Sequence, residues 1–157
     1  MRRTLSVALV AAAAALPLTA QEQPHAFRGA TLIPISGAPI QNGVLVVQGG
    51  RITAVGGPET AIPAGAVVHD AAGKTIMPGL VDTHSHIGNG DGGDRSSPMH
   101  PSVRILDAID ARDEGIQKAQ SGGITTVNVM PGSGLLMSGQ TAYLKLRDGN
   151  DIYDLLF

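Results

Sequence analysis

Two histidines separated by one residue, His84 and His86, have the clearest capacity for chemistry in this sequence. Successive side chains of an extended strand alternate between its faces, so these two project to the same side, together with Asp82. Neutral imidazole is a common ligand of zinc and similar cations, and two imidazoles supply half of a four-coordinate shell. The spacing therefore predicts a divalent metal site with His84 and His86 as ligands, zinc as the expected ion and Asp82 as a supporting group.

The alternative is that the two histidines are unrelated surface residues. Pro78 and Gly79 mark a break before a new strand, and Leu80-Val81 begin that strand as a buried strand begins. A polar segment, residues 88–97, follows at its carboxyl end, where βα loops carry the chemistry of an α/β barrel. This context favours the metal-binding interpretation.

The segment from Gly73 to His86, GKTIMPGLVDTHSH, closely resembles the first-strand signature of the metal-dependent amidohydrolase superfamily. Within it, the nearest likeness is to secreted members related to imidazolonepropionase and to Xaa-Pro dipeptidases, and it extends from about Phe27 to Phe157. The resemblance implies an α/β fold with an all-β flank, in which a composite, urease-like β-sandwich precedes a TIM-type (β/α)8 barrel. It also implies hydrolysis of a carbon–nitrogen bond in a small amide, lactam or dipeptide, with metal-activated water.

Much of such an enzyme has no counterpart in this chain. A barrel needs eight strands and about 250 residues, whereas the part after His84 accommodates two or three βα units. The family's other ligands, and the final-strand aspartate that is its usual general base, are missing. The resemblance thus implies an N-terminal fragment whose general base lies beyond Phe157, and we expect this chain alone to be inactive.

Composition narrows the classes of partner. The chain has 157 residues, a net charge of -2 and no cysteine. Without a basic excess, nucleic acid is not an expected partner. Disulfides and thiolate ligands are excluded, so any metal must be held by His, Asp, Glu or a modified Lys. A small-molecule or dipeptide substrate is the expected partner.

Residues 1–20 are typical of a signal peptide. Arg2 and Arg3 precede an apolar run from Leu5 to Leu18, and Ala20 is the expected cleavage position. The alternative, a membrane anchor, would need about 20 apolar residues. We expect an exported protein, periplasmic or secreted, with no stable membrane anchor after cleavage.

Residues 21–77 are predicted to form part of a β-sandwich. Short β-rich runs alternate with turns, and Gly49-Gly50 between two apolar runs is a strong hairpin signal. The predicted strands are Ala30–Pro34, Gly43–Gln48, Arg51–Val55, Ala66–Val68 and Thr75–Ile76. His25 and His69 are expected to be surface residues, the first in the linker after the cleavage site.

Residues 78–157 are predicted to begin the barrel. Apolar residues at helical spacing predict a helix from Pro101 to about Ser121 with Ser102 as N-cap. A strand over Ile124–Val129 would complete a βαβ unit and hence a parallel sheet. A third short strand is expected over Thr141–Leu146, leaving an unpaired edge through which the chain could self-associate.

The remaining candidate site residues lie in the loops around these strands. The glycine-rich connection that includes Gly139 and Gln140 is either a substrate-contacting loop beside the metal or an ordinary connection. His100, in the loop before Pro101, is a candidate to face the site from the barrel mouth. A competing hypothesis of another class is a small exported β-sandwich module for binding or interaction, without catalysis. A downstream reading frame carrying further His and Asp ligands would favour the enzyme.

Overall fold

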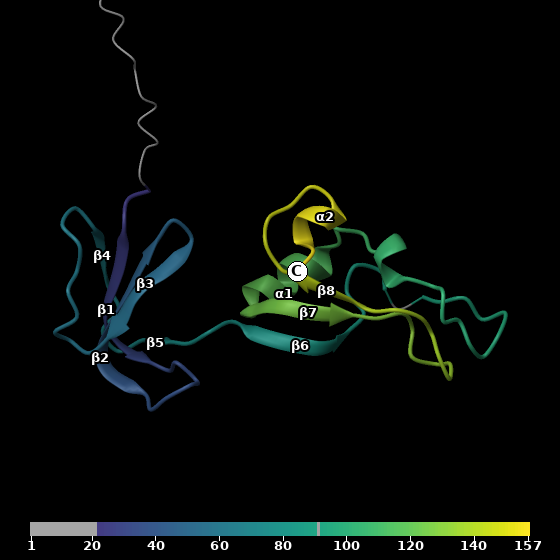
Figure 1. The fold of residues 1–157 in the computed structure, drawn as a ribbon, viewed down its shortest axis with the longest axis horizontal. Coiled ribbons are helices and arrows are strands. Elements are labelled where there is room, and N and C mark those ends of the chain that lie inside the picture. The colour runs from purple at the N-terminus through teal and green to yellow at the C-terminus, as the bar shows by residue number, and fades with distance from the viewer. Residues whose placement is uncertain (1–21, 91) are drawn as a thin grey trace, which may run out of the picture. The chain divides into compact units, whose positions relative to one another are not determined.

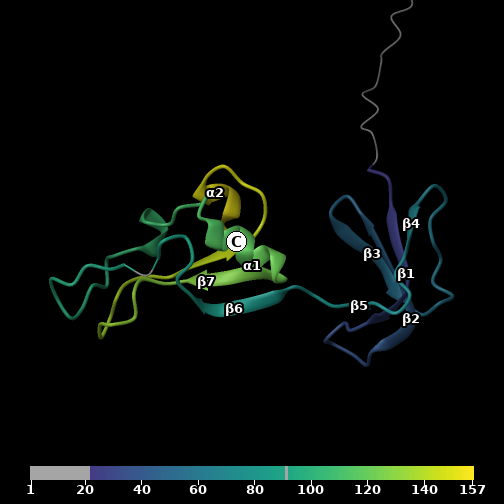
Figure 2. The same ribbon diagram turned by 180° about the vertical axis from the view of Figure 1, so that it is seen from behind.

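The computed structural model describes residues 22–90 and 92–157, so the predicted signal peptide lies outside the described residues. The chain divides into two compact units, one ending at Met77 and the other spanning Pro78–Phe157. Figures 1 and 2 show the first in purple to blue and the second in teal to yellow. Within the described ranges, no helix is long and apolar enough to cross a membrane.

The first unit is a single mixed sheet of five strands. Its strands are β1 (His25–Leu32), β2 (Ile40–Gln48), β3 (Arg51–Gly56), β4 (Val67–Asp70) and β5 (Thr75–Ile76). The order is β3-β2-β1-β4, and β5 also pairs with β1. Strand β2 runs antiparallel to both β1 and β3, whereas β4 and β5 run parallel to β1. The predicted hairpin is confirmed, because Gly49 and Gly50 take φ values of 57° and 67° between β2 and β3.

Apolar clusters lie on both faces of this sheet. One contains Ala26, Val44 and Val46, and the other contains Ala30 and Leu32 with Phe27 packed against them. The β1–β2 register shifts between Arg28 and Ala30, and this bulge moves the later alternate residues of β1 to the face of Phe27. Residues 22–77 thus form one sheet with apolar residues on both faces, which fits the partial β-sandwich predicted for this part of the chain.

The second unit contains a three-stranded sheet with short helices. Its elements are β6 (Leu80–Ser85), the 3₁₀ helix η1 (Ile105–Asp107), α1 (Glu114–Ser121), β7 (Ile124–Val129), β8 (Ala142–Lys145) and α2 (Ile152–Leu155). Strands β6 and β7 are parallel, and α1 lies in the connection between them, so the predicted βαβ unit is present. Its buried core is formed by Ile105, Ile116, Val127, Val129, Leu144, Leu146 and Leu155.

The predicted helix from Pro101 to Ser121 is wrong over most of its length. Helix α1 begins at Glu114, and its N-cap is Asp113, whose carboxylate accepts a hydrogen bond from the Gly115 N–H at 2.8 Å. The Asp110 carboxylate accepts in the same way from the Arg112 N–H at 2.9 Å. Two acidic side chains within the predicted helix therefore bind backbone N–H groups in turns instead of extending into solvent from a helix.

The third strand was predicted to continue a parallel sheet, and this is also wrong. Strand β8 runs antiparallel to β7. The connection between them contains no helix, which a parallel crossover usually needs. The outer edge of β8 is partly covered, because Leu156 bridges to Leu144 and the Phe157 N–H donates to the Tyr143 carbonyl at 3.2 Å. The described residues therefore contain one pair of parallel strands, β6 and β7, and the predicted barrel is not confirmed.

Candidate functional site

The end of β6 brings His84 and His86 together. Between them, Ser85 is buried at 5% exposure and turns toward the core, while His84 is exposed and His86 is half-buried. The two imidazole centroids are 5.2 Å apart, with their ring planes at 80°. Strand alternation thus places both rings on the same side, where two nitrogen ligands can reach one ion.

A backbone carbonyl at the end of the neighbouring strand holds His86. Its Nδ1 lies 2.9 Å from the Met130 carbonyl oxygen, which can accept but not donate, so Nδ1 carries the proton. The Met130 N–H in turn donates to the Ser85 carbonyl at 3.0 Å. This leaves Nε2 of His86 with its lone pair, and the Ser133 hydroxyl lies 3.4 Å from it. Proteins usually orient a metal-binding histidine by a hydrogen bond from its other ring nitrogen, as Nδ1 of His86 makes to Met130.

Asp82 supports the backbone of the same strand end. Its Oδ1 accepts a hydrogen bond from the His84 N–H at 3.0 Å. That bond fixes the backbone direction from which the His84 ring projects. Among the described residues the Asp82 carboxylate bonds to the backbone at His84 and not to an imidazole ring, and its supporting role at a metal stays a prediction.

The donor set fits part of a metal shell. The described residues contain no group of three or more His, Asp or Glu side chains close enough to hold one ion. The two imidazoles, of which His86 has its Nε2 lone pair oriented, can fill two coordination positions of a divalent ion. The remaining coordination positions are left to water or to further ligands. No carboxylate positioned as a general base was identified from the sequence, and among residues 22–90 and 92–157 the structure groups no third His, Asp or Glu with the His84–His86 pair.

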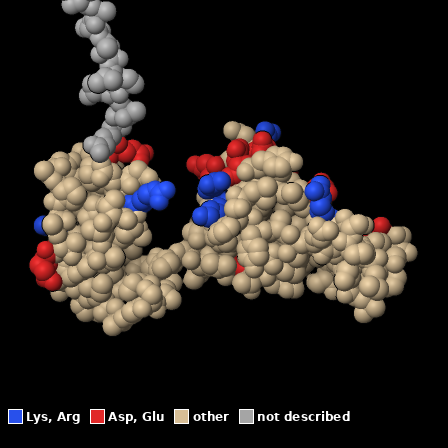
Figure 3. All heavy atoms as spheres, in the orientation of Figure 1, with Lys and Arg blue, Asp and Glu red and all other residues tan. Residues whose placement is uncertain are grey.

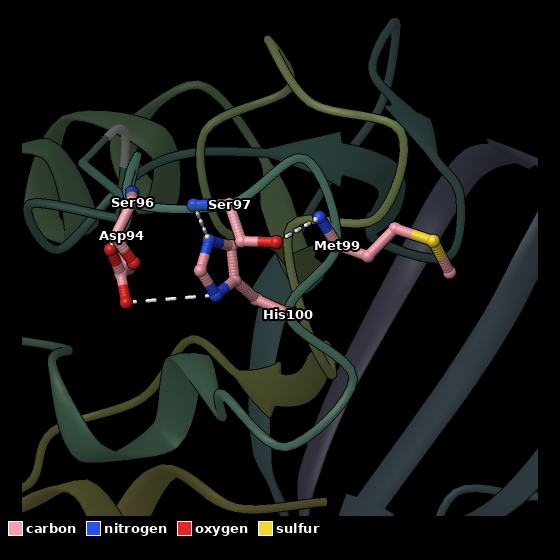
Figure 4. A network of polar contacts seen from close by, with 5 residues as sticks. All are labelled: Asp94, Ser96, Ser97, Met99 and His100. Carbon is pink, nitrogen blue, oxygen red and sulfur yellow. Dashed lines mark hydrogen bonds and ion pairs between the residues drawn. The ribbon is translucent and has the colours of Figure 1, made fainter.

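His100 belongs to a separate polar network in its own loop (Figure 4). Its ring is 9% exposed, with Nδ1 3.6 Å from Asp94 Oδ2 and Nε2 accepting a hydrogen bond from the Ser97 N–H at 3.2 Å. Hydrogen bonds from the backbone and side chain of Ser96, with a smaller contribution from His100, lower the pKa of Asp94. Both ring nitrogens of His100 are thus engaged locally, and the structure does not bring them to His84 or His86.

Gly139 and Gln140 fasten two loops together. The Gln140 N–H donates to the Val103 carbonyl at 2.7 Å, its carbonyl accepts from the Ile105 N–H at 3.0 Å, and its side-chain amide donates to the Pro101 carbonyl at 3.0 Å. Gly139 has φ +136°, and a Cβ there would lie 2.5 Å from the Val103 oxygen. These residues therefore position the loop around 98–105, whichever role that loop has toward a substrate.

A small cavity of about 110 Å³ adjoins the histidine pair through Ser133. It is lined by Gly93, Arg95, Gly132, Ser133, Gly134 and Leu135. Sequence reasoning pointed to the glycine-rich loop but not to Arg95 or Ser133. The loop lies directly after β7 and beside the end of β6, which His86 follows, and this position was the signal that could have selected Ser133.

Comparisons with known proteins find relatives among the amidohydrolases, although no family model matches the chain. An amidohydrolase of Hapsidospora irregularis is 32% identical over 114 residues, which cover 66% of this chain and 12% of the relative. Imidazolonepropionase of Paracoccus denitrificans is 29% identical over 135 residues, covering 68% of this chain and 33% of the relative.

Among solved structures, an amidohydrolase from Thermotoga maritima superposes with a TM-score of 0.75 at 32% identity. The match covers 84% of this chain and 36% of that one, so the chain spans well under half the length of each of these relatives. Both kinds of comparison therefore confirm the resemblance of this chain to the amidohydrolase superfamily, which the segment ending in His84 and His86 predicts.

Proposed function

We propose that this chain supplies the first metal ligands and the flanking sheet of an exported, metal-dependent amidohydrolase. The reaction is hydrolysis of a carbon–nitrogen bond in a small amide, lactam or dipeptide. The observation that supports this most directly is the pair His84 and His86 on one side of β6, with His86 Nε2 left as an acceptor by the Met130 carbonyl.

In this proposal His84 and His86 hold a divalent ion, with zinc expected. When bound, such an ion supplies a nucleophile from water at neutral pH and polarises the oxygen of the scissile carbonyl. The chain's own residues orient the ligands. Met130 fixes the tautomer of His86, and Asp82 fixes the backbone at His84. A hydrolase also needs a group that moves a proton to the leaving nitrogen, and we place that group outside this chain, so the chain alone is inactive.

The two curated relatives support the proposed class of reaction but do not identify the substrate. The printed names of the two curated relatives are an amidohydrolase and an imidazolonepropionase. Because the chain spans 12% and 33% of their lengths, their activities apply here as part of the proposal. The substrate-selecting surface of a barrel is built from all of its βα loops, and few of them fall within these residues.

A metal titration of the full chain tests the ligand assignment. Calorimetry with Zn²⁺, and visible absorption with Co²⁺, should show binding that the double variant His84→Ala/His86→Ala weakens by an order of magnitude or more. His100→Ala is the matched control, because that ring is engaged with Asp94 and Ser97 and should leave the titration unchanged. If the double variant binds as the parent does, the assignment is wrong.

Two further measurements address activity and export. Assays of the zinc-loaded chain with dipeptides and cyclic amides should show no appreciable turnover, whereas turnover lost on His84→Ala would mean that a base lies within these residues.

Intact mass of the protein recovered from periplasm or medium should correspond to a chain beginning near Gln21. Recovery of the uncleaved chain in the cytoplasm would count against export.

A further inference from the structure

A second pair of histidines lies in the first unit, on strands β1 and β4. These strands are parallel neighbours in which Phe27 is opposite His69 and His25 is opposite Val67. Alternation therefore puts His25, Phe27 and His69 on one face of the sheet. The Nδ1 of His25 lies 2.9 Å from Nε2 of His69. The sequence predicted two surface histidines, with His25 in a linker. The linker assignment is wrong, because His25 begins β1, and strand pairing brings the two rings into contact.

The two imidazoles meet at their edges. Their planes are nearly parallel, at 10°, and their centroids are 5.2 Å apart. The nitrogen–nitrogen distance of 2.9 Å is shorter than the roughly 3.5–4.0 Å between atoms in stacked contact. The contact is therefore an in-plane N–H···N hydrogen bond, in which one nitrogen carries a proton and the other presents a lone pair.

Phe27 holds one member of the pair in place. Its ring lies parallel to the His69 ring, at 16° and with centroids 4.6 Å apart. This contact restricts rotation of the His69 side chain, so a ligand that uses its Nε2 does not have to order that ring first. His25 is exposed, which leaves space for water beside the pair.

The spacing of the two nitrogens matches that of neighbouring ligands on one metal ion. Metal–imidazole bonds of about 2.0–2.1 Å at a right angle place the two nitrogens about 2.9 Å apart. That is the distance between His25 Nδ1 and His69 Nε2. Right-angle positions are those of square-planar and tetragonal ions, Cu²⁺ and Ni²⁺, and Cu²⁺ has the highest affinity for nitrogen donors among the first-row divalent ions.

We propose that His25 and His69 form a two-histidine site for a tetragonal divalent ion, with Cu²⁺ the strongest binder, separate from the His84–His86 pair. To bind one ion, the two rings must tilt. The lone pairs of His25 Nδ1 and His69 Nε2 then point to one common position, to the side of the present N–H···N hydrogen bond. The shared proton moves to the other nitrogen of its own ring, and water fills the remaining positions. The ion ties β1 to β4 in the folded chain, so its binding raises the stability of the first unit.

The test uses the full chain carrying His84→Ala and His86→Ala, which removes the other pair. In this background, a Cu²⁺ titration followed by electron paramagnetic resonance should show one ion with a tetragonal spectrum and coupling to imidazole nitrogens. Adding His25→Ala or His69→Ala should weaken binding by an order of magnitude or more and reduce that nitrogen coupling. Since all these proteins share the same N-terminus, the differences between them report the histidine pair.

Two controls keep the result interpretable. Circular dichroism should show that His25→Ala, a change at an exposed position, leaves the sheet folded. Gln48→Ala, also in the first unit but without an imidazole, should leave Cu²⁺ binding unchanged. Equal Cu²⁺ affinity with and without His25, or a spectrum without imidazole coupling in the parent background, would overturn the proposal.

Discussion

The Nδ1 nitrogen of His86 lies 2.9 Å from the carbonyl oxygen of Met130, which is the first residue after β7. One hydrogen bond thus joins the carboxyl ends of two parallel strands and assigns a tautomer to the candidate ligand. Parallel strands end at the same edge of their sheet, so a residue 44 positions away in sequence is available for this contact.

This contact predicts which tautomer neutral His86 adopts in the metal-free chain. A carbonyl oxygen cannot donate, so neutral His86 should carry its proton on Nδ1 and leave Nε2 unprotonated. Two-dimensional ¹⁵N–¹H correlation of the imidazole rings distinguishes the two tautomers. His86→Ala identifies the signals, and a ring protonated at Nε2 would contradict the geometry described for the site.

A second prediction concerns the fastening of the two loops at Gly139. Gly139→Ala places a methyl group against the Val103 carbonyl, at a φ that side chains rarely adopt. Strain of this kind costs about 1 to 3 kcal/mol. Urea denaturation should therefore show a lower free energy of unfolding for Gly139→Ala. Gly134→Ala is the matched control, since a Cβ at Gly134 meets nothing within 4 Å. Equal stability of the two variants would show that the close approach is not maintained in solution.

Local patterns in the sequence were sufficient for some features of this fold. Gly49-Gly50 specified a hairpin because two glycines take positive φ at little cost. The histidine spacing placed His84 and His86 on one side, because alternation is a property of the strand itself. Both inferences depend on residues close together in the chain.

Features that depend on distant residues were not available from such patterns. The direction of β8 follows from its pairing with β7, and the placement of His100 follows from the conformation of its loop around Asp94. The contact between His25 and His69 depends on β1 and β4 being neighbours in the sheet. Apolar periodicity does not encode which strands become neighbours, so these relationships required the folded structure.

The start of α1 gives a third prediction, because the sequence and the structure assign different N-caps. Asp113 accepts from the Gly115 N–H, so Asp113→Ala should lower the free energy of unfolding by about 0.5 to 2 kcal/mol. Asp113→Asn keeps an acceptor oxygen and should lose much less. Ser102→Ala, at the position that the sequence favoured, should leave the stability unchanged. Thermal and urea unfolding of the three variants decide between the two assignments, and a larger loss at Ser102 would support the longer helix.

The last prediction concerns self-association through the outer edge of β6. In the sheet β6-β7-β8, β6 is bonded on one side by β7, while the far edge of β8 is partly covered by residues 156–157. Leu80 and Val81 on β6 are 50% and 57% exposed. An edge strand with exposed apolar side chains is a template for pairing with another copy, and a lysine on such a strand opposes that pairing.

We therefore expect the parent chain to associate as its concentration rises, and Val81→Lys to shift it toward the monomer in sedimentation equilibrium. Leu136→Lys, at an 86% exposed position outside the strands, adds the same charge and should not have that effect. A parent chain that stays monomeric at all concentrations, or equal effects of the two lysines, would exclude the edge of β6 as the site of association.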